Sequence, residues 1–248
     1  MLNNKIALIT GVGTGIGLAT AKRYLKEGAK VIGVGDYNKE FEDFGNNFEY
    51  VKCDVTDEKN IAELADHIAK KYGVLDILLT ICDREYRGKM LEVDAATINQ
   101  ASKHILTAPI LLSKNLKDLL AKSTLASVIF DFPISAFMID KNYLESIYNL
   151  ALADYVRQAT AQFRPIRVNG VMFGLIKDHF LAKEDEERFA KTAKKESMIP
   201  SQRIGTCEDV ANLNNFLADE LSKFFNSALI PIDGGYYTAN PRSMGNQF

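Results

Sequence analysis

The sequence predicts a doubly wound α/β fold, in which helices cover both faces of a parallel seven-stranded sheet. Two observations support this prediction. Residues 5–36 contain an apolar run, a stretch with helical spacing and a second apolar run, which together form one strand–helix–strand unit. Short apolar runs then alternate with helical stretches along the rest of the chain. With 248 residues and no repeat or linker, we expect one domain over residues 1–248.

The expected elements follow in order along the chain. The apolar runs that predict buried strands lie at residues 5–10, 31–34, 48–53, 75–80, 127–132, 167–172 and 229–235. Helical spacing is found at residues 18–27, 58–71, 98–120, 143–163 and 181–198. Gly28 is expected to end the first helix, and Thr56 or Asp57 to cap the second. Pro109 should kink the long third helix, because proline has no N–H to donate.

Composition excludes several classes of partner. The formal net charge of −2 gives no reason to expect binding to nucleic acid or to an anionic membrane surface. No apolar run is long enough to span a membrane, and a first strand that starts at residue 5 leaves no room for a signal peptide. Cys53, Cys82 and Cys207 share no metal-ligand spacing, so we expect free thiols, no metal and a cytoplasmic protein.

Glycines directly follow the first strand and precede the first helix. They let the backbone turn sharply and approach a pyrophosphate, whose charge the start of the helix favours. Asp36, at the end of the second strand, can accept hydrogen bonds from the hydroxyls of an adenosine ribose. The alternative is a tight turn without a ligand. The expected cofactor-binding residues of this unit are Gly11, Thr14, Gly15, Ile16, Gly17 and Asp36.

The spacing Thr10-Gly11-x-x-x-Gly15-Ile16-Gly17 resembles the short-chain dehydrogenase/reductase family, including its 3-oxoacyl-ACP reductases. The similarity continues to Ile232-Asp233-Gly234-Gly235 near the end of the chain. The resemblance implies a Rossmann fold, an NAD or NADP cofactor, and a homo-oligomer, either a dimer or a tetramer, built on the helices at 98–120 and 143–163. Those helices also fit an ordinary core.

The resemblance further implies a complete site for adenosine. Asp54 matches the acid that takes the exocyclic amine of adenine, and Val55 matches the apolar residue that packs on the ring. Asp54 alternatively serves as a turn or helix-cap residue. The backbone at Ile176 is the group left to contact the nicotinamide carboxamide, since Asp178 stands where the family has threonine.

The expected catalytic centre departs from the family. Tyr143 matches the catalytic tyrosine, but Ile147 stands where the family has lysine and Ile105 where it has asparagine. The serine position falls on Phe132 or Pro133. The family's Asn-Asn-Ala-Gly turn is replaced by residues 80–83, Thr-Ile-Cys-Asp. Without an adjacent ammonium, a phenol that titrates near about 10 is a poor base at neutral pH.

Three functional interpretations therefore stay open. In the first, the chain binds a nicotinamide dinucleotide or another adenine nucleotide and has weak or no carbonyl/alcohol redox activity. In the second, it is an NAD-dependent oxidoreductase with a rebuilt site, which uses Tyr143 with help from His104, Asp131 or Lys141. In the third, it contributes only as a subunit in a mixed oligomer with an active relative. His104 alternatively is a surface or core histidine, and Asp131 an edge-facing charge.

We expect NAD rather than NADP as the cofactor. The carboxylate of Asp36 would repel a 2′-phosphate, and Thr14 stands where some NADP-binding members have a basic residue. Asp36 comes one residue later than the acid of NAD-using relatives, whose position Gly35 occupies, and Lys39 is a possible compensating cation.

Overall fold

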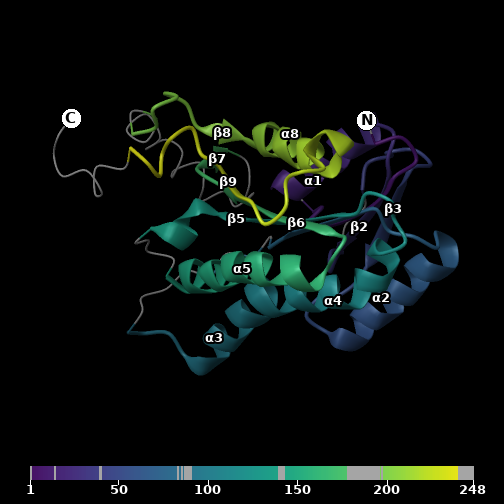
Figure 1. The fold of residues 1–248 in the computed structure, drawn as a ribbon. Helices are drawn as coiled ribbons and strands as arrows, with labels where there is room; N and C mark the ends of the chain where they lie inside the picture. Colours follow the sequence, from purple (N-terminus) through teal and green to yellow (C-terminus); the bar gives the residue numbers. More distant parts are fainter. Residues whose placement is uncertain are drawn as a thin grey trace.

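The computed structural model describes residues 2–13, 15–38, 41–82, 84, 86, 91–138, 143–177, 196 and 198–239. Within these residues, seven parallel strands form one sheet in the order β3-β2-β1-β4-β5-β6-β9 (Figure 1), which confirms the predicted fold class. The strands are β1 (Ile6–Thr10), β2 (Lys30–Gly35), β3 (Phe48–Lys52), β4 (Ile77–Ile81), β5 (Ser127–Pro133), β6 (Arg167–Phe173) and β9 (Leu229–Ile232). A separate parallel pair joins β7 (Ile176–Lys177) and β8 (Gly205–Thr206).

Helices cover both faces of this sheet (Figure 1). One face carries α1 (Gly15–Lys26) and α8 (Cys207–Ala218), and the other carries α2 (Glu58–Lys71), α4 (Ala108–Leu120) and α5 (Tyr143–Gln162). The remaining helical segments are α3 (Ala95–Ser102), η1 (Lys103–Thr107), η2 (Ile134–Phe137) and η3 (Glu220–Ser222). Among the described helices, none is both long and apolar enough to cross a membrane.

The core consists of two layers, one on each side of the sheet. Leu8, Leu78 and Phe130 belong to the layer under α2, α4 and α5, whereas the neighbouring Ile9 and Ile129 belong to the layer under α1 and α8. Successive residues of a strand point to opposite faces, so a strand buried on both sides needs apolar residues throughout. This requirement explains the uninterrupted apolar runs of the sequence.

The chain reverses its direction of winding between β1 and β4. From β1 the chain proceeds outward to β2 and β3, then returns to the other side of β1 to form β4 and β5. In open parallel sheets, such a switch point leaves a crevice at the carboxyl ends of the strands. Thr10 fastens the two strands there, since its hydroxyl donates to the Ile81 carbonyl at 3.1 Å and accepts from the Ile81 amide at 2.9 Å.

The long helix expected at residues 98–120 begins earlier, at Ala95, and is interrupted by a π-turn. Across η1 the amide of Ala108 donates to the Lys103 carbonyl, five residues back. Pro109 follows directly and supplies no N–H, so the expected irregularity at this proline takes the form of a π-turn. The helix ends agree with the sequence: Asp57 caps α2, and Gly28 follows α1 with a φ of 89°.

Asp131 lies in neither of the places that the sequence suggests. Its strand, β5, is central in the sheet, between β4 and β6, so the residue is not an edge-facing charge. Its side chain is buried under α8, where the Asn214 amide donates to one carboxylate oxygen at 2.6 Å. Burial raises the pKa of Asp131 to about 8, partly offset by that hydrogen bond. Asp131 is therefore a structural acid of the α1/α8 layer.

Candidate nucleotide site

The carboxyl ends of β1, β2 and β4 enclose a pocket at the switch point. It contains about 570 Å³ of space, part of which is open to solvent. Residues that follow β1, β2, β3 and β4 form one side of this pocket, and the π-turn with the start of α4 forms the other. Its lining residues are Thr10, Gly11, Val34, Gly35, Asp36, Tyr37, Cys53, Asp54, Val55, Thr80, Ile81, Cys82, Arg84, His104, Ala108, Pro109 and Leu112.

The glycine loop connects β1 to α1 beside this pocket. Gly11 and Gly15 have φ values of 69° and 60°, which L-residues with a side chain rarely adopt. Gly17 is needed for a different reason, because a Cβ there would lie 2.2 Å from the Gly11 carbonyl oxygen. The loop is thus tightly packed against the start of its helix, which is the arrangement that presents backbone N–H groups to a phosphate.

Asp54 makes the turn contacts that the sequence allowed, and the residue also lines the pocket. Its Oδ1 accepts from the amide and the hydroxyl of Thr56, at 2.9 and 2.8 Å, in a turn before α2. Its residue also lines the pocket, next to Val55. Burial acts to raise the pKa of Asp54, but the two Thr56 hydrogen bonds outweigh it, helped by His104 and Arg84, so the pKa is lowered. A charged acceptor therefore stands at the pocket wall.

Asp36 lies at the mouth of the pocket and is partly exposed. Its side chain is 48% exposed, and its Oδ1 is 3.5 Å from the Lys52 ammonium. Lys52 also donates to Asn38 Oδ1 at 2.6 Å. The carboxylate therefore faces a lysine on β3 as well as the pocket, in a position where solvent screens its charge.

Thr80 carries a buried hydroxyl that has no hydrogen-bond partner among the described residues. The residue is 2% exposed and lines the pocket opposite Ala108 and Pro109. A buried polar atom without a partner costs about 1–3 kcal/mol, so such atoms usually meet a partner when the site is filled. The hydroxyl fits a pocket that receives a polar ligand; the sequence marked Thr80 only as the first residue of the replaced Asn-Asn-Ala-Gly turn.

His104, on the π-turn, is hydrogen-bonded and also reaches the pocket. Its Nδ1 pairs with the Tyr86 hydroxyl and lies 3.0 Å from the Gln100 carbonyl oxygen. The Tyr86 amide in turn donates to Glu145 Oε1, at 2.7 Å, on α5. The histidine thus belongs to a chain of contacts that links the segment after β4 to two helices, as the satisfied-histidine alternative expects, while its ring forms part of the pocket wall.

Tyr143 lies outside the pocket. It packs on a small apolar cluster that includes Ile105 and Leu144, and its hydroxyl is buried without a partner among the described residues. Ile147, four residues on, is uncharged and 53% exposed. Phe132, at one of the two positions for the family's serine, is buried in the core. Tyr143 therefore packs on apolar side chains, and no described group pairs with its phenol oxygen.

The structure brings some of the expected residues together and separates others. Gly11, Asp36, Asp54 and Val55 line one pocket, with the rest of the described glycine loop, Gly15, Ile16 and Gly17, directly behind it. Ile176 belongs to β7, which pairs with β8, and does not line the pocket. The expectations for Thr14, Lys39, Asp83, Lys141, Asp178 and most of the helix at 181–198 lie outside the described residues.

The three cysteines form no disulfide in the part of the chain that the structure describes. Two of them, Cys53 and Cys82, line the pocket. Burial and the neighbouring carboxylate of Asp54 raise the pKa of the Cys53 thiol to about 11, so this thiol is protonated and unreactive at neutral pH. No group of three or more metal-binding side chains occurs in the part of the chain that the structure describes.

Sequence comparison finds relatives that span nearly the whole chain. The family model described as enoyl-(acyl carrier protein) reductase matches residues 11–237. The cis-4-hydroxycyclohexanecarboxylate dehydrogenase of Sinomonas cyclohexanicum is 29% identical over 242 residues, which cover 94% of this chain and 96% of that protein. The 3-oxoacyl-(acyl-carrier-protein) reductase of Buchnera aphidicola subsp. Acyrthosiphon pisum (strain APS) is 28% identical, with coverage of 95% and 98%.

Structural comparison agrees with these matches. The ligand-free aldohexose dehydrogenase of Thermoplasma acidophilum superimposes with a TM-score of 0.86 at 25% identity, covering 96% of this chain and 95% of that one. A variant of ElxO with NADPH bound also has a TM-score of 0.86 at 25% identity, covering 95% and 99%. With its parallel sheet, its glycine loop and a family model that matches residues 11–237, the chain belongs to the short-chain dehydrogenase/reductase family.

Proposed function

We propose that this short-chain dehydrogenase/reductase binds an adenine nucleotide, with NAD preferred to NADP, and that its carbonyl/alcohol redox activity is weak or absent. The contrast between two hydroxyl groups carries the proposal. Thr80, whose buried hydroxyl has no partner among the described residues, lines a pocket together with the charged Asp54, whereas the Tyr143 hydroxyl is buried in an apolar cluster outside that pocket. The polar groups that line the pocket can meet a ligand, whereas no group in the described part of the chain pairs with the phenol oxygen.

The pocket residues fit the adenosine part of a dinucleotide. The Gly11 turn would take the diphosphate, the Asp54 carboxylate the exocyclic amine, and the Thr80 hydroxyl one further polar atom. Val34 and Val55 offer apolar surface to a planar base. Nicotinamide, where bound, supplies hydride transfer, and the protein must supply the proton and hold the substrate oxygen.

The residues near Tyr143 support weak or absent turnover. A lysine four positions later would favour the phenolate, but Ile147 carries no charge and is 53% exposed. Ile105, at the asparagine position, is buried in the same apolar cluster as Leu144. Loss of the phenol proton would therefore leave a phenolate among apolar side chains, and such surroundings raise the free energy of a charged group.

An active enzyme with a rebuilt site is the alternative, and one contact favours it. The Tyr86 hydroxyl and His104 Nδ1 form a hydrogen bond, and His104 lines the pocket. A hydroxyl paired with an imidazole is a donor–acceptor pair of the kind that transfers protons in enzymes. Asp131 no longer supports this alternative, because it is buried in the layer under α1 and α8.

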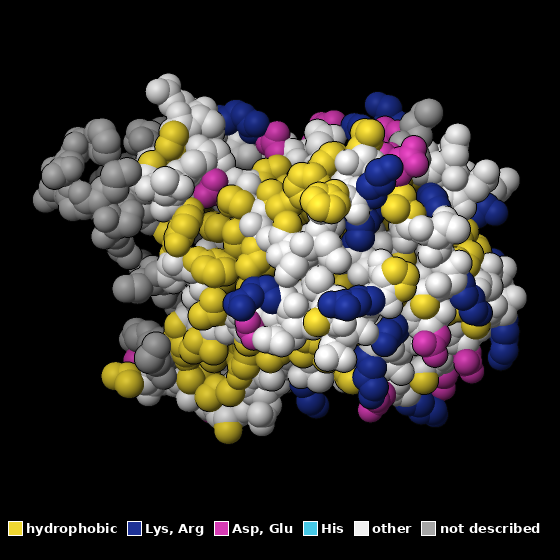
Figure 2. Space-filling view, viewed as in Figure 1, with side chains coloured by type: hydrophobic (Ala, Val, Ile, Leu, Met, Phe, Trp, Pro, Cys, Tyr) yellow, Lys and Arg dark blue, Asp and Glu magenta, His cyan; other side chains and the backbone are white. Residues whose placement is uncertain are grey.

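Association into a homodimer or homotetramer is part of the proposal, as is a cytoplasmic location. Hydrophobic side chains gather on the side of the molecule that carries α3 and the first half of α5 (Figure 2). On α5, Ile147 and Leu150 are 53% and 49% exposed. Isolated exposed apolar residues are common, but a contiguous patch of them is typical of an interface.

Two measurements on the full chain test the function. Isothermal titration with NAD, NADP and ADP should show binding of NAD and ADP below millimolar concentration. Incubation of the protein with NADH and a panel of ketones should leave NADH unconsumed, and Tyr143→Phe should change neither result. Absence of binding by any adenine nucleotide contradicts the proposed site. Ketone-dependent loss of NADH that Tyr143→Phe or His104→Gln abolishes supports the rebuilt enzyme instead.

A further inference from the structure

Tyr37, directly after Asp36, packs its ring against two glycines. A Cβ on Gly35 would lie 2.1 Å from Tyr37 Cε2, and a Cβ on Gly13 would lie 2.6 Å from Tyr37 Cε1. These distances are shorter than any packed side chain permits, so the ring occupies the space that side chains at both positions would fill. The ring therefore fills the space between the end of β2 and the glycine loop.

The two glycines have no other evident reason to be glycine. Gly11 and Gly15 have positive φ values, but Gly13 and Gly35 do not. A glycine in a strand or loop without positive φ usually marks the close approach of another group. The approaching group at both positions is the ring of Tyr37. Gly13 and Gly35 thus leave room for the ring of Tyr37.

The ring is held in place from its other side. The Tyr37 amide donates to the Tyr50 hydroxyl at 2.9 Å, and that hydroxyl donates to the Gly35 carbonyl at 2.7 Å. The rings of Tyr50 and Phe41 lie 6.2 and 6.3 Å from the ring of Tyr37, centroid to centroid. These contacts fix Tyr37 on the pocket side of an aromatic cluster.

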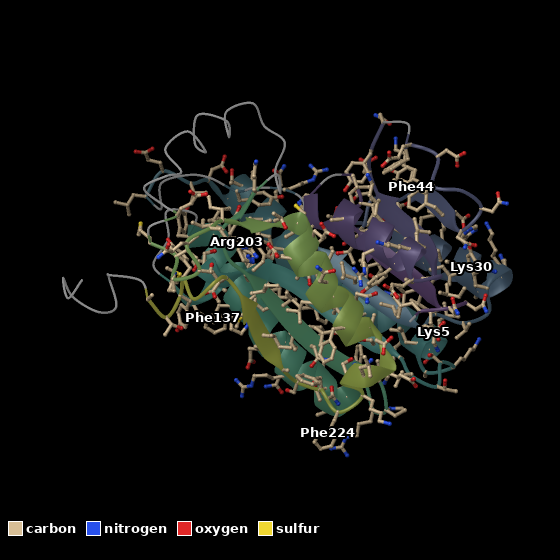
Figure 3. The ribbon with its side chains drawn as sticks, turned by 90° about the horizontal axis from the view of Figure 1, so that it is seen from above. Lys5, Lys30, Phe44, Phe137, Arg203 and Phe224 are labelled. Atoms are coloured by element: carbon tan, nitrogen blue, oxygen red, sulfur yellow. The ribbon has the colours of Figure 1, made fainter. Side chains whose placement is uncertain are left out.

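That cluster extends outward along the β2–β3 connection. The rings of Phe41 and Phe48 are 5.7 Å apart, and those of Phe44 and Phe48 are 4.8 Å apart. Figure 3 shows Phe44 next to α1, and the Lys22 ammonium of that helix lies 5.7 Å from its ring centroid. Moving Tyr37 would therefore disturb a packed group of side chains, which makes the ring a firm wall.

Tyr37 also lines the pocket, together with Gly35, Asp36 and Gly11. An adenosine that reaches the Gly11 turn places its ribose at the end of β2, where the ribose hydroxyls meet the first residues after the strand. Here those residues are an acid and an aromatic ring. The Lys52 ammonium at the same turn already contacts Asp36 and Asn38. A phosphate on the ribose would meet the ring and a carboxylate.

We propose that Tyr37 is the specificity-determining residue of this pocket, because its ring fills the room that the 2′-phosphate of NADP would need while it accepts the plain ribose of NAD. This inference rests on the proposed nucleotide binding. It assigns the selection to a steric wall, whereas the sequence assigned it to the charge of Asp36. An exposed charge is screened by salt, but a packed ring excludes a phosphate at any ionic strength.

The test is isothermal titration of the full chain with NAD and with NADP, at low and high salt. Tyr37→Ala should raise the affinity for NADP about tenfold relative to that for NAD. Tyr37→Phe, the matched control, keeps the ring and should leave the ratio unchanged. Asp36→Asn should change the ratio by no more than about twofold at high salt. Gly35→Ala displaces the ring from its other side and should also admit NADP, which provides a second variant if Tyr37→Ala does not fold.

The outcomes separate this inference from the function on which it rests. If the unaltered chain binds neither nucleotide, the proposed function fails and the inference fails with it. If NAD binds but Tyr37→Ala and Gly35→Ala leave the NAD/NADP ratio unchanged, the function stands and the role of Tyr37 is overturned. A ratio that only Asp36→Asn alters, and that salt reduces, assigns the selection to the carboxylate.

Discussion

The pocket beside β1 and β4 and the cluster around Tyr143 differ in what surrounds their polar groups. In the pocket, the Asp54 carboxylate accepts two hydrogen bonds from Thr56, and Thr80, one of the lining residues, has a buried hydroxyl without a described partner. Around Tyr143 the described neighbours include Ile105 and Leu144, and no described group meets the phenol oxygen. The same sheet supports both regions, so the fold does not explain the difference.

This contrast shows how binding and chemistry depend on different parts of one scaffold. Binding of an adenosine needs a backbone turn, an acceptor and apolar walls, all of which follow from strand ends. Proton transfer needs a second ionisable group within hydrogen-bond reach of the first. In this chain the described residues around Tyr143 pack against it. Such packing can stabilise a fold even where the residues needed for proton transfer are replaced.

The largest effect that would break the contrast is expected at the glycine loop. Gly17→Ala places a Cβ 2.2 Å from the Gly11 carbonyl oxygen, so the loop must move. We expect the affinity for NAD to fall by more than about a hundredfold, and stability by about 1–3 kcal/mol, as overpacking usually costs. Gly45→Ala is the control, since a Cβ there meets nothing within 4 Å and only its positive φ is strained. Unchanged NAD binding in Gly17→Ala would refute the site.

The second effect concerns the stability of the sheet on which both regions lie. Asp131 has its pKa raised by burial to about 8, from a usual value of 3.8. Between these values the unfolded chain loses a proton that the folded chain keeps. The contribution of Asp131 to the free energy of unfolding is therefore fully present below about pH 4. As the pH rises from there to about pH 8, the free energy of unfolding falls by about 1.4 kcal/mol per pH unit.

Asp131→Asn should remove this dependence. Urea unfolding at several pH values should show a difference between the two proteins that grows from pH 4 to pH 8, in favour of the asparagine variant. Tyr24 on α1 interacts electrostatically with this acid, and burial raises the pKa of its phenol well above the usual value, so Tyr24 stays neutral in that range. A constant difference across the range would mean that Asp131 is ionised in the folded protein.

A smaller effect would sharpen the contrast between the two unpartnered hydroxyls. Thr80→Val keeps the side-chain shape and replaces the hydroxyl with a methyl group. If the hydroxyl meets a ligand, affinity for NAD should fall about five- to tenfold, while the thermal stability of the ligand-free protein stays equal or rises. Titration and thermal unfolding measure the two quantities separately. Stability that rises with unaltered affinity would show that the ligand does not use this hydroxyl.

The smallest effect is expected from adding the missing ammonium. Ile147→Lys creates the tyrosine and lysine spacing of the family, but the side chain at this position is 53% exposed. A lysine there should extend into water and leave the phenol unactivated, so we expect no ketone-dependent consumption of NADH. The double variant with Tyr143→Phe is the control. Turnover that appears with the lysine and disappears with the phenylalanine would show that a single residue separates this chain from an active enzyme.

Much of the fold and part of the site could be predicted from local sequence. The strand periodicity, the glycine spacing and the Asp54-Val55 pair depend on neighbours in the chain. The predicted strands form one sheet, and Gly11, Asp54 and Val55 line one pocket at its strand ends. Gly17 also follows this rule, since its close contact is with Gly11 in the same loop. Spacing alone carries this information because the interactions are short in sequence.

The remaining features depend on contacts between distant segments. The ring of Tyr37 meets Gly13 across a turn, and Asp131 meets Asn214 from a helix 83 residues away. Whether a hydroxyl such as that of Thr80 has a partner depends on what every other segment supplies. The periodicity of apolar residues along the sequence does not predict such contacts. A glycine inside a strand, as at Gly35, was the one available signal that another side chain approaches.

The π-turn of η1 has a consequence for how this chain can change. A π-turn holds one residue more than the α-helical turn it replaces, so removing one residue of η1 would restore ordinary helical winding and leave α3 and α4 in nearly the same register. The change would be confined to the turn itself, which carries the pocket residue His104. A single deleted codon can thus alter this wall while the helices on either side of it keep their faces, and length variants of the segment are a direct route to new ligand preferences.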